Sequence, residues 1–237
     1  MLKKRIIPLL LLMNDRLVKT VNFEKFKDVG NPISTAKIFN DSDADELILL
    51  NINRDKRASS TLIPVLKKIS EECFVPIAAG GGIYSIENAT DIIKSGADKV
   101  VLNSICYDDY NFIKSLANKF GRQAVVASID VRKIDKKFCL FSNCGTILNK
   151  IPLEEHIQNL IKNDVGEIMI NSIDCEGTMQ GPDHDLIKQV SNSCNVPLIY
   201  SGGIGNYDHI KDIFQMANIS AVACGSLFNF TDSNPIR

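Results

Sequence analysis

The stretch Pro76-Ile-Ala-Ala-Gly-Gly-Gly-Ile-Tyr-Ser85 organises this chain, because a related stretch follows later as Pro197-Leu-Ile-Tyr-Ser-Gly-Gly-Ile-Gly-Asn206. In each stretch an apolar run leads into a glycine pair, and a helical pattern follows. Glycine lets the backbone approach a ligand closely, and a helix N-terminus offers unpaired N–H groups and the positive end of the helix dipole. One such turn has low specificity. Two of them in one chain predict two anion sites, for phosphate.

The composition is that of a globular chain. Of the 237 residues, 45% are apolar and 23% are charged, so a sizeable core is expected. The net charge of −1 gives no support for nucleic-acid binding. The longest apolar run, Ile6 to Met13, is too short to span a bilayer, and no small-residue cleavage site follows it. We therefore expect a cytoplasmic protein without a nucleic-acid or membrane partner.

Cysteine and histidine give no sign of a disulfide framework, a metal site or a cofactor. The seven cysteines are an odd number without a CxxC pair. Cys139 and Cys144 lie closest together, but no second ligand pair accompanies them. The three histidines fall in polar helical surroundings, which predicts surface positions for His156, His184 and His209.

Apolar, β-rich runs alternate with helical patterns along the chain, as in βα units around a parallel sheet. The runs are almost continuously hydrophobic, as strands covered on both faces must be. The predicted strands are 5–12, 46–51, 76–79, 99–103, 124–130, 167–171, 197–201 and 220–224. They predict an α/β fold, a single closed (β/α)₈ TIM barrel over residues 1–237. A doubly wound open sheet is the alternative, but its Gly-x-Gly-x-x-Gly fingerprint is missing after the first strand.

One segment interrupts the alternation. Residues 138–142 and 146–148 flank Asn143-Cys144-Gly145, which predicts a β-hairpin inserted after strand five.

The two halves of the chain resemble each other. Glu46-Leu-Ile-Leu-Leu matches Glu167-Ile-Met-Ile-Asn, and Gly82 matches Gly203 at the same offset. A barrel built from two half-barrels follows, with ligands at the C-terminal ends of the strands. Gly82 with Ser104 would form one phosphate site, and Gly203 with Ser226 the other. A ligand with phosphate at both ends is the simplest inference.

Short segments spread over the chain carry a family resemblance. They are Lys4-Arg-Ile-Ile-Pro8, Val18-Lys-Thr-Val-Asn-Phe23, Ala44-Asp-Glu-Leu47, Gly80-Gly-Gly-Ile83, Gly96-Ala-Asp-Lys-Val100, Ile129-Asp130, Gly166-Glu-Ile168, Gly177-Thr178 and Ser201-Gly-Gly203. Through them the chain closely resembles the cyclase subunit of imidazole glycerol phosphate synthase. The resemblance implies that a glutaminase subunit docks on the N-terminal face of the barrel. Its ammonia would pass through the barrel to the opposite face.

The resemblance also implies two catalytic aspartates, near the C-terminal ends of strands one and five. Asp130 matches the strand-five position, but Leu11 stands where the strand-one acid belongs. A leucine cannot exchange a proton, and a positioned acid or base contributes about 10²–10⁴-fold. Of the implied ligand-pocket positions, Lys19 is kept, whereas Asn51 and Glu176 each replace the usual aspartate. Asp15 falls in the next loop, so we do not expect it to substitute.

The opposite face keeps its charges. The family's four charged floor positions, which gate the ammonia passage, match here as a charged ring of Arg5, Glu46, Lys99 and Glu167. Asp98 matches a position that faces the glutaminase. The ring could simply plug the barrel. Buried ion pairs contribute little net stability, however, which favours a gating role.

Leu11 combined with a retained ring resembles a divergent subgroup of the family. That subgroup accompanies a glutaminase and a sugar amidotransferase in bacterial surface-polysaccharide (LPS/O-antigen) synthesis, which implies sugar amidation. The main alternative is a working cyclase, a lyase of histidine biosynthesis. Two others are a silent scaffold that only stimulates its glutaminase, and a sugar-phosphate isomerase, which would also need the strand-one acid. The phosphate turns could bind a phosphorylated small molecule or simply hold the top of the barrel together.

Overall fold

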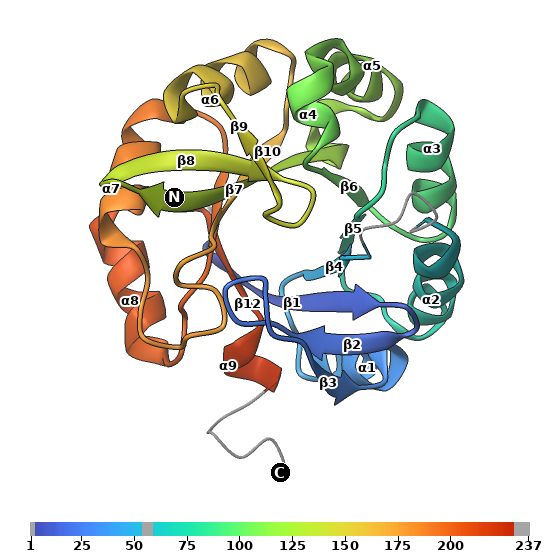
Figure 1. Cartoon of the computed structure of the whole chain (residues 1–237). Coiled ribbons are helices and arrows are strands. Elements are labelled where there is room, and N and C mark those ends of the chain that lie inside the picture. Colours follow the sequence, from blue (N-terminus) through green and yellow to red (C-terminus); the bar gives the residue numbers. More distant parts are fainter. Residues whose placement is uncertain (1–2, 54–58, 230–237) are drawn as a thin grey trace.

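Eight parallel strands close into a barrel in the computed structural model, which describes residues 3–53 and 59–229 (Figure 1). The ring closes where β12 pairs with β1, with Arg5 opposite Ala221. In ring order the barrel strands are β1 (Arg5–Met13), β4 (Leu47–Asn51), β5 (Ile77–Gly80), β6 (Lys99–Leu102), β7 (Val125–Ile134), β10 (Glu167–Ser172), β11 (Leu198–Ser201) and β12 (Ala221–Cys224). The predicted TIM barrel is confirmed.

The helices surround the barrel (Figure 1). They are α1 (Pro32–Asp41), α2 (Ser59–Glu72), α3 (Ile86–Lys94), α4 (Ile105–Asp108), α5 (Tyr110–Phe120), η1 (Arg122–Ala124), α6 (Leu153–Lys162), α7 (His184–Ser193), α8 (Tyr207–Met216) and α9 (Ser226–Asn229). Side-chain caps start several of them. Asn31 accepts hydrogen bonds from the N–H groups of Ile33 and Ser34 at the start of α1, with Pro32 in the first turn.

The two glycine turns have the same backbone geometry. Gly81 and Gly82 have φ of 101° and 73°, and Gly202 and Gly203 have φ of 116° and 78°. These values lie in the left-handed region that glycine tolerates and other residues rarely adopt. The correspondence supports the half-barrel repeat inferred from the sequence.

Two antiparallel ribbons extend the barrel. The predicted hairpin after strand five is present as β8 (Lys137–Ser142) and β9 (Ile147–Asn149), with β9 displaced by one residue from its predicted start. The other ribbon, β2 (Arg16–Lys19) and β3 (Lys27–Gly30), was not predicted; it pairs with the C-terminal end of β1. These strands are short and partly exposed, so no apolar run marks them.

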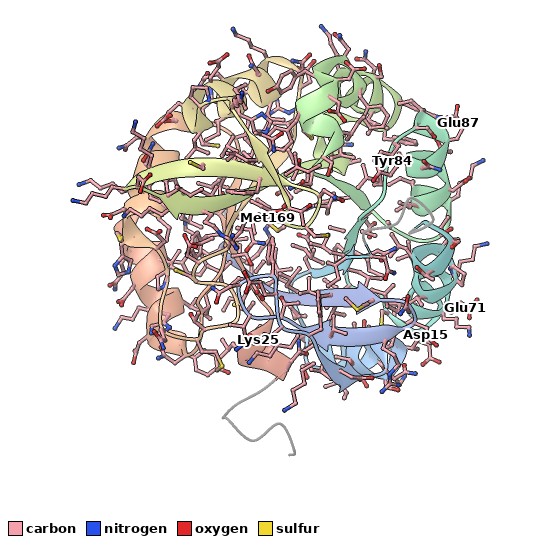
Figure 2. The ribbon with its side chains drawn as sticks, viewed as in Figure 1. Asp15, Lys25, Glu71, Tyr84, Glu87 and Met169 are labelled. Atoms are coloured by element: carbon pink, nitrogen blue, oxygen red, sulfur yellow. The ribbon has the colours of Figure 1, made fainter. Side chains whose placement is uncertain are left out.

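Alternate residues of each barrel strand face the interior and the helices. On β10, for example, Glu167, Met169 and Asn171 follow one another from the N-terminal end upward, while Ile168 and Ile170 pack toward the helices. Met169 lies near the centre of the barrel in Figure 2. The apolar interior consists of Ile7, Leu9, Ile48, Ala78, Val101, Val126, Met169, Ile199, Ala221 and Ala223. Burial on both faces explains the continuous hydrophobic runs.

One predicted surface residue is buried. His156 on α6 has no exposed area; its ring stacks on Tyr107 at 4.3 Å, and Nδ1 shares a hydrogen bond with the Tyr110 hydroxyl at 2.7 Å. Burial lowers the pKa of His156 to about 4, so the ring is neutral. Its spacing to Leu153, Ile157 and Leu160 places it on the core face of the helix, a signal that the surface prediction overlooked. His184 is exposed and His209 is half-buried.

Candidate functional site

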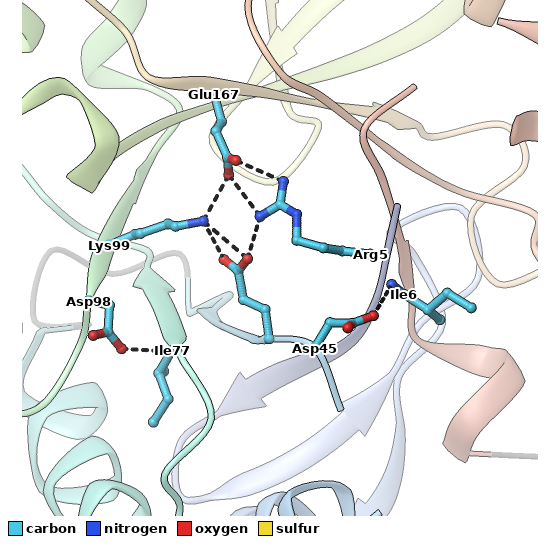
Figure 3. A network of polar contacts seen from close by, with 8 residues as sticks. Arg5, Ile6, Asp45, Ile77, Asp98, Lys99 and Glu167 are labelled. Carbon is cyan, nitrogen blue, oxygen red and sulfur yellow. Dashed lines mark hydrogen bonds and ion pairs between the residues drawn. The ribbon is translucent and has the colours of Figure 1, made fainter. Parts of the chain in front are cut away.

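Four charged side chains close the N-terminal end of the barrel as a ring (Figure 3). The guanidinium of Arg5 contacts Glu46 Oε2 at 2.5 Å and Glu167 Oε1 at 2.7 Å. The Lys99 ammonium contacts Glu46 Oε1 at 2.9 Å and Glu167 Oε2 at 3.0 Å. Each cation therefore bridges both carboxylates. All four positions predicted from the sequence meet at one point.

The charged ring is largely shielded from water. The Glu46 side chain is only 3% exposed, and the other three are 12–20% exposed. Burial opposes the charge of Arg5, but Glu167 and Glu46 beside it raise the pKa of its guanidinium above the usual range. Because each charge is compensated by two partners, the ring can sit directly beneath the apolar interior.

Two aspartates flank the ring at the same end of the barrel (Figure 3). Asp98 is exposed, and its carboxylate accepts a hydrogen bond from the Ile77 N–H at 2.8 Å. Asp45, which the sequence analysis did not single out, accepts one from the Ile6 N–H at 3.0 Å. Both carboxylates thus tie neighbouring barrel strands together beside the ring, and Asp98 remains accessible on this face.

Two adjoining cavities occupy the C-terminal end of the barrel. The first cavity has a volume of about 140 Å³, and the predicted Gly82, Ser104, Asn51, Asp130 and Glu176 all line it. The second cavity is smaller, about 30 Å³, and is lined by the predicted Gly203 and Ser226. Leu9, Leu11 and Glu176 line both cavities. Each predicted phosphate pair therefore falls in one cavity, and Leu11 lies where the two adjoin.

Asp130 is the buried acid of the first cavity, with 7% exposure. Its Oδ2 accepts a hydrogen bond from Asn103 Nδ2 at 3.1 Å, and its Oδ1 accepts one from Asn171 Nδ2 at 3.4 Å. Burial raises the pKa of Asp130 to about 7 against the opposing effect of these two bonds, and the charge of Glu176 raises it further. At neutral pH this carboxyl can both bind and release a proton, as general acid–base catalysis requires.

The wall around Leu11 is apolar. Leu11 pairs in register with Leu50 on β4, and both line the first cavity with Leu9. Asp15 is exposed in the turn between β1 and β2 and lies at the periphery in Figure 2. As expected, Asp15 does not fill the place of the missing strand-one acid.

Glu176 fastens the segment after β2 across the mouth of the barrel. Its Oε1 accepts a hydrogen bond from the Thr20 hydroxyl at 2.8 Å, and its Oε2 accepts one from the Phe23 N–H at 3.2 Å. Burial raises the pKa of Glu176, while Thr20, Phe23 and the nearby Lys19 oppose the shift. Lys19 itself lies at the end of β2 and does not line either cavity; Thr20 lines the first instead. Lys19 acts electrostatically on Glu176, which lines both cavities, and its pocket role stays a prediction.

The inserted hairpin reaches over the first phosphate turn. The Asn143 N–H donates to Ser104 Oγ at 3.1 Å, and Cys144 Sγ donates to the Ile52 carbonyl at 3.5 Å. Asn143 and Cys144 both line the first cavity. Asn51 accepts hydrogen bonds from the side chain and the N–H of Asn53, so it organises the neighbouring loop.

Two asparagines contact Asp130, an arrangement that was not predicted from the sequence, where Asn103 was placed only in the first phosphate turn. Asn103 directly follows β6, and Asn171 is the register partner of Asp130 on the next strand. Their positions at the ends of predicted strands were the available signal. Among residues 3–53 and 59–229, no group of three or more His, Cys, Asp or Glu side chains is arranged to hold a metal ion. Nor is any helix in these ranges both long and apolar enough to cross a bilayer.

Comparisons with known proteins give a consistent assignment. A family model described as "Histidine biosynthesis protein" matches residues 5–233. The chain is 38% identical over 230 residues to imidazole glycerol phosphate synthase subunit HisF of Chlorobium phaeobacteroides, covering 97% of this chain and 92% of that protein. It is 36% identical over 234 residues to the HisF subunit of Bacillus cereus, with 98% and 93% covered. It is 41% identical over 232 residues to a Pseudomonas aeruginosa protein provisionally named imidazole glycerol phosphate synthase subunit hisF2, with 97% and 92% covered. The chain therefore belongs to the histidine biosynthesis protein family and is similar over nearly its whole length to the HisF subunits of imidazole glycerol phosphate synthase.

Proposed function

We propose that this chain is a synthase subunit that receives ammonia from a glutaminase docked on its N-terminal barrel face, next to Asp98. The observation that carries the proposal is the charged ring, which meets the apolar interior on one side and the outer face on the other. An uncharged molecule of the size of ammonia is the kind of solute that an apolar interior admits once the ring opens. The interior-facing residues extend from the charged ring at the N-terminal end of the barrel to the first cavity at the C-terminal end.

We further propose that the ammonia ends in sugar amidation, within cytoplasmic synthesis of a surface polysaccharide, and that a sugar amidotransferase is a further partner. Leu11 supports this fate, because an apolar wall replaces the acid that imidazole-ring formation would use. The two glycine turns would hold a phosphorylated small molecule, one end in each cavity.

An isotope experiment tests the conduit. The chain is combined with its glutaminase and the amidotransferase, and [amide-¹⁵N]glutamine is supplied with a large excess of unlabelled ammonium in the buffer. Transfer through the barrel predicts that the product keeps the ¹⁵N label. Dilution of the label to the level of the bulk pool would show that the ammonia travels through solution instead.

The second candidate is a working cyclase (lyase) of histidine biosynthesis. Asp130 favours it, because its pKa of about 7 suits an acid–base residue and its cavity adjoins that of the second phosphate turn. Turnover of the histidine-pathway precursor with ammonium, abolished by Asp130→Asn, would establish this function. Complementation of a histidine auxotroph separates the two candidates in vivo.

A further inference from the structure

Among residues 3–53 and 59–229, Asn171 carries a buried acceptor atom without a hydrogen-bond partner. The residue ends the inward-facing series of β10, is 7% exposed and lines the first cavity. Its Nδ2 donates to Asp130, but no donor in the described part of the chain reaches its buried Oδ1. Buried polar atoms in native proteins are nearly always hydrogen-bonded. An unused acceptor at a cavity wall therefore indicates a ligand that donates a hydrogen bond.

Among the described residues, the neighbourhood of this acceptor is negative and rich in lone pairs. Asp130 receives one amide hydrogen on each oxygen, which leaves further acceptor positions on the carboxylate. No basic side chain in residues 3–53 and 59–229 forms an ion pair with Asp130. Glu176 lines the same cavity and acts electrostatically on Asp130. An anionic group would be repelled beside Asp130 and Asn171 themselves, whereas a small cation bearing several N–H groups would satisfy both residues.

We propose that Asp130 and Asn171 form a binding site for ammonium at the point where the barrel interior opens into the first cavity. This inference deepens the proposed function and rests on it for the source of the ammonia. Asp130 and Asn171 are register partners on β7 and β10, one inward-facing layer above Ser128 and Met169. One N–H of the ammonium donates to Asn171 Oδ1, and another donates to the Asp130 carboxylate.

The site also provides the proton that ammonia needs to become ammonium. Ammonia crosses the apolar interior uncharged, and at the cavity its lone pair takes the proton of the neutral Asp130 carboxyl. The products are a carboxylate and an ammonium ion, so charge and protons balance without another reagent. Return of the proton regenerates the nucleophilic ammonia. The raised pKa of Asp130, whose electrostatic neighbours include Glu176 and Tyr107, keeps both protonation states available at neutral pH.

Carboxyl NMR of the isolated full chain tests the site. With ¹³C-labelled aspartate, the pKa of Asp130 is measured while ammonium chloride replaces tetramethylammonium chloride at constant ionic strength. We expect a saturable fall of about one pH unit in ammonium, since a cation within about 4–6 Å lowers a carboxyl pKa by about 1–3 units. An equal pKa in the two salts, or a shift that never saturates, would overturn the site.

Two asparagine variants separate the site from a general salt effect. Asn171→Leu removes the unused acceptor and should abolish the ammonium-specific shift. Asn103→Leu removes the other amide contact with Asp130 and should leave that shift in place. Persistence of the shift in Asn171→Leu would contradict the assignment. If circular dichroism shows that Asn171→Leu is unfolded, Asn171→Thr keeps one oxygen acceptor and should raise the ammonium midpoint about tenfold. An unchanged midpoint would count against the site.

The titration needs no glutaminase, so its failure is separable from failure of the conduit. Retained ¹⁵N label without ammonium binding would leave the conduit and remove the site. Ammonium binding without retained label would do the reverse.

Discussion

The Arg5 guanidinium on β1 forms an ion pair with Glu167 Oε1 on β10 at 2.7 Å, although β1 and β10 are not neighbours in the sheet. The ion pair therefore spans the interior of the barrel. Lys99 on β6 makes the matching contact with Glu167. Because both cations share both carboxylates, loss of either cation leaves two buried acids with a single partner.

Removal of one cation should destabilise the barrel. Lys99→Met leaves Glu46 and Glu167 with Arg5 alone, and we expect a loss of about 3 kcal/mol in the free energy of unfolding. Urea denaturation measures it. Lys37→Met is the matched control, because the Lys37–Glu72 pair is half exposed and its loss should change stability little. Equal effects of the two variants would contradict the buried character of the ring.

Asp130 should make stability depend on pH in an unusual direction. Its pKa is about 7 in the folded chain, above the ordinary value of 3.8. Between these values the folded state holds a proton that the unfolded state releases, so stability falls as the pH rises. From pH 5 to pH 8, the wild type should lose about 2–3 kcal/mol more than Asp130→Asn. Urea denaturation at both pH values measures the difference, with Asp15→Asn as an exposed control. Parallel profiles for wild type and Asp130→Asn would contradict the raised pKa.

Restoring the strand-one acid should restore cyclase chemistry. Wild type should not turn over the histidine-pathway precursor with ammonium, whereas Leu11→Asp should gain at least about 10²-fold over the background. Product formation by purified protein is the measurement. Leu50→Asp places a carboxylate on the same wall from the neighbouring strand and should stay inactive. Activity of the wild type itself would favour the histidine-biosynthesis candidate.

Glu176 should hold the segment after β2 in place. Glu176→Ala removes the acceptors of the Thr20 hydroxyl and the Phe23 N–H. Phe23 has φ of 63°, a strained conformation for a bulky residue, so the freed segment should relax. Hydrogen exchange should therefore be at least about tenfold faster at the Phe23 amide, a loosening of roughly 1.4 kcal/mol or more. Thr20→Val removes only one of the two bonds and should have a smaller effect; unchanged exchange in Glu176→Ala would rule out this restraint.

The second glycine turn should not tolerate a side chain at Gly203. A Cβ on Gly203 would lie 1.9 Å from the Gly181 carbonyl oxygen, and its φ of 78° adds backbone strain. We expect Gly203→Ala to lower the free energy of unfolding by about 2–3 kcal/mol. Gly225→Ala, in the same cavity, meets only an ordinary 3.5 Å contact with the Leu9 carbonyl oxygen and should be tolerated. Inorganic phosphate should raise the melting temperature of the wild type and of Gly225→Ala. No rise in either protein would contradict a phosphate role for this turn.

Much of the architecture could be predicted from the sequence because it depends on local patterns. Apolar runs of strand length, broken by helical patterns, specify a parallel sheet covered on both faces. The glycine pairs specify turns with positive φ, and the matching offset of Gly82 and Gly203 indicates two half-barrels. The absence of an acid at Leu11 is visible only through the resemblance to the cyclase subunit, which implies an aspartate at that position.

Tertiary structure alone decided which distant groups meet, because contact depends on barrel closure and on side-chain direction. Closure brings Arg5 to Glu167, and the register of β7 and β10 places Asn171 beside Asp130. Burial then determines chemistry: it makes His156 a neutral core residue and raises the pKa of Asp130 toward neutrality. The sequence by itself determined the strands, the turns and the residue types. Their packing decided that the Asp130 carboxyl holds a proton near neutral pH and that Asn171 Oδ1 has no donor among the described residues.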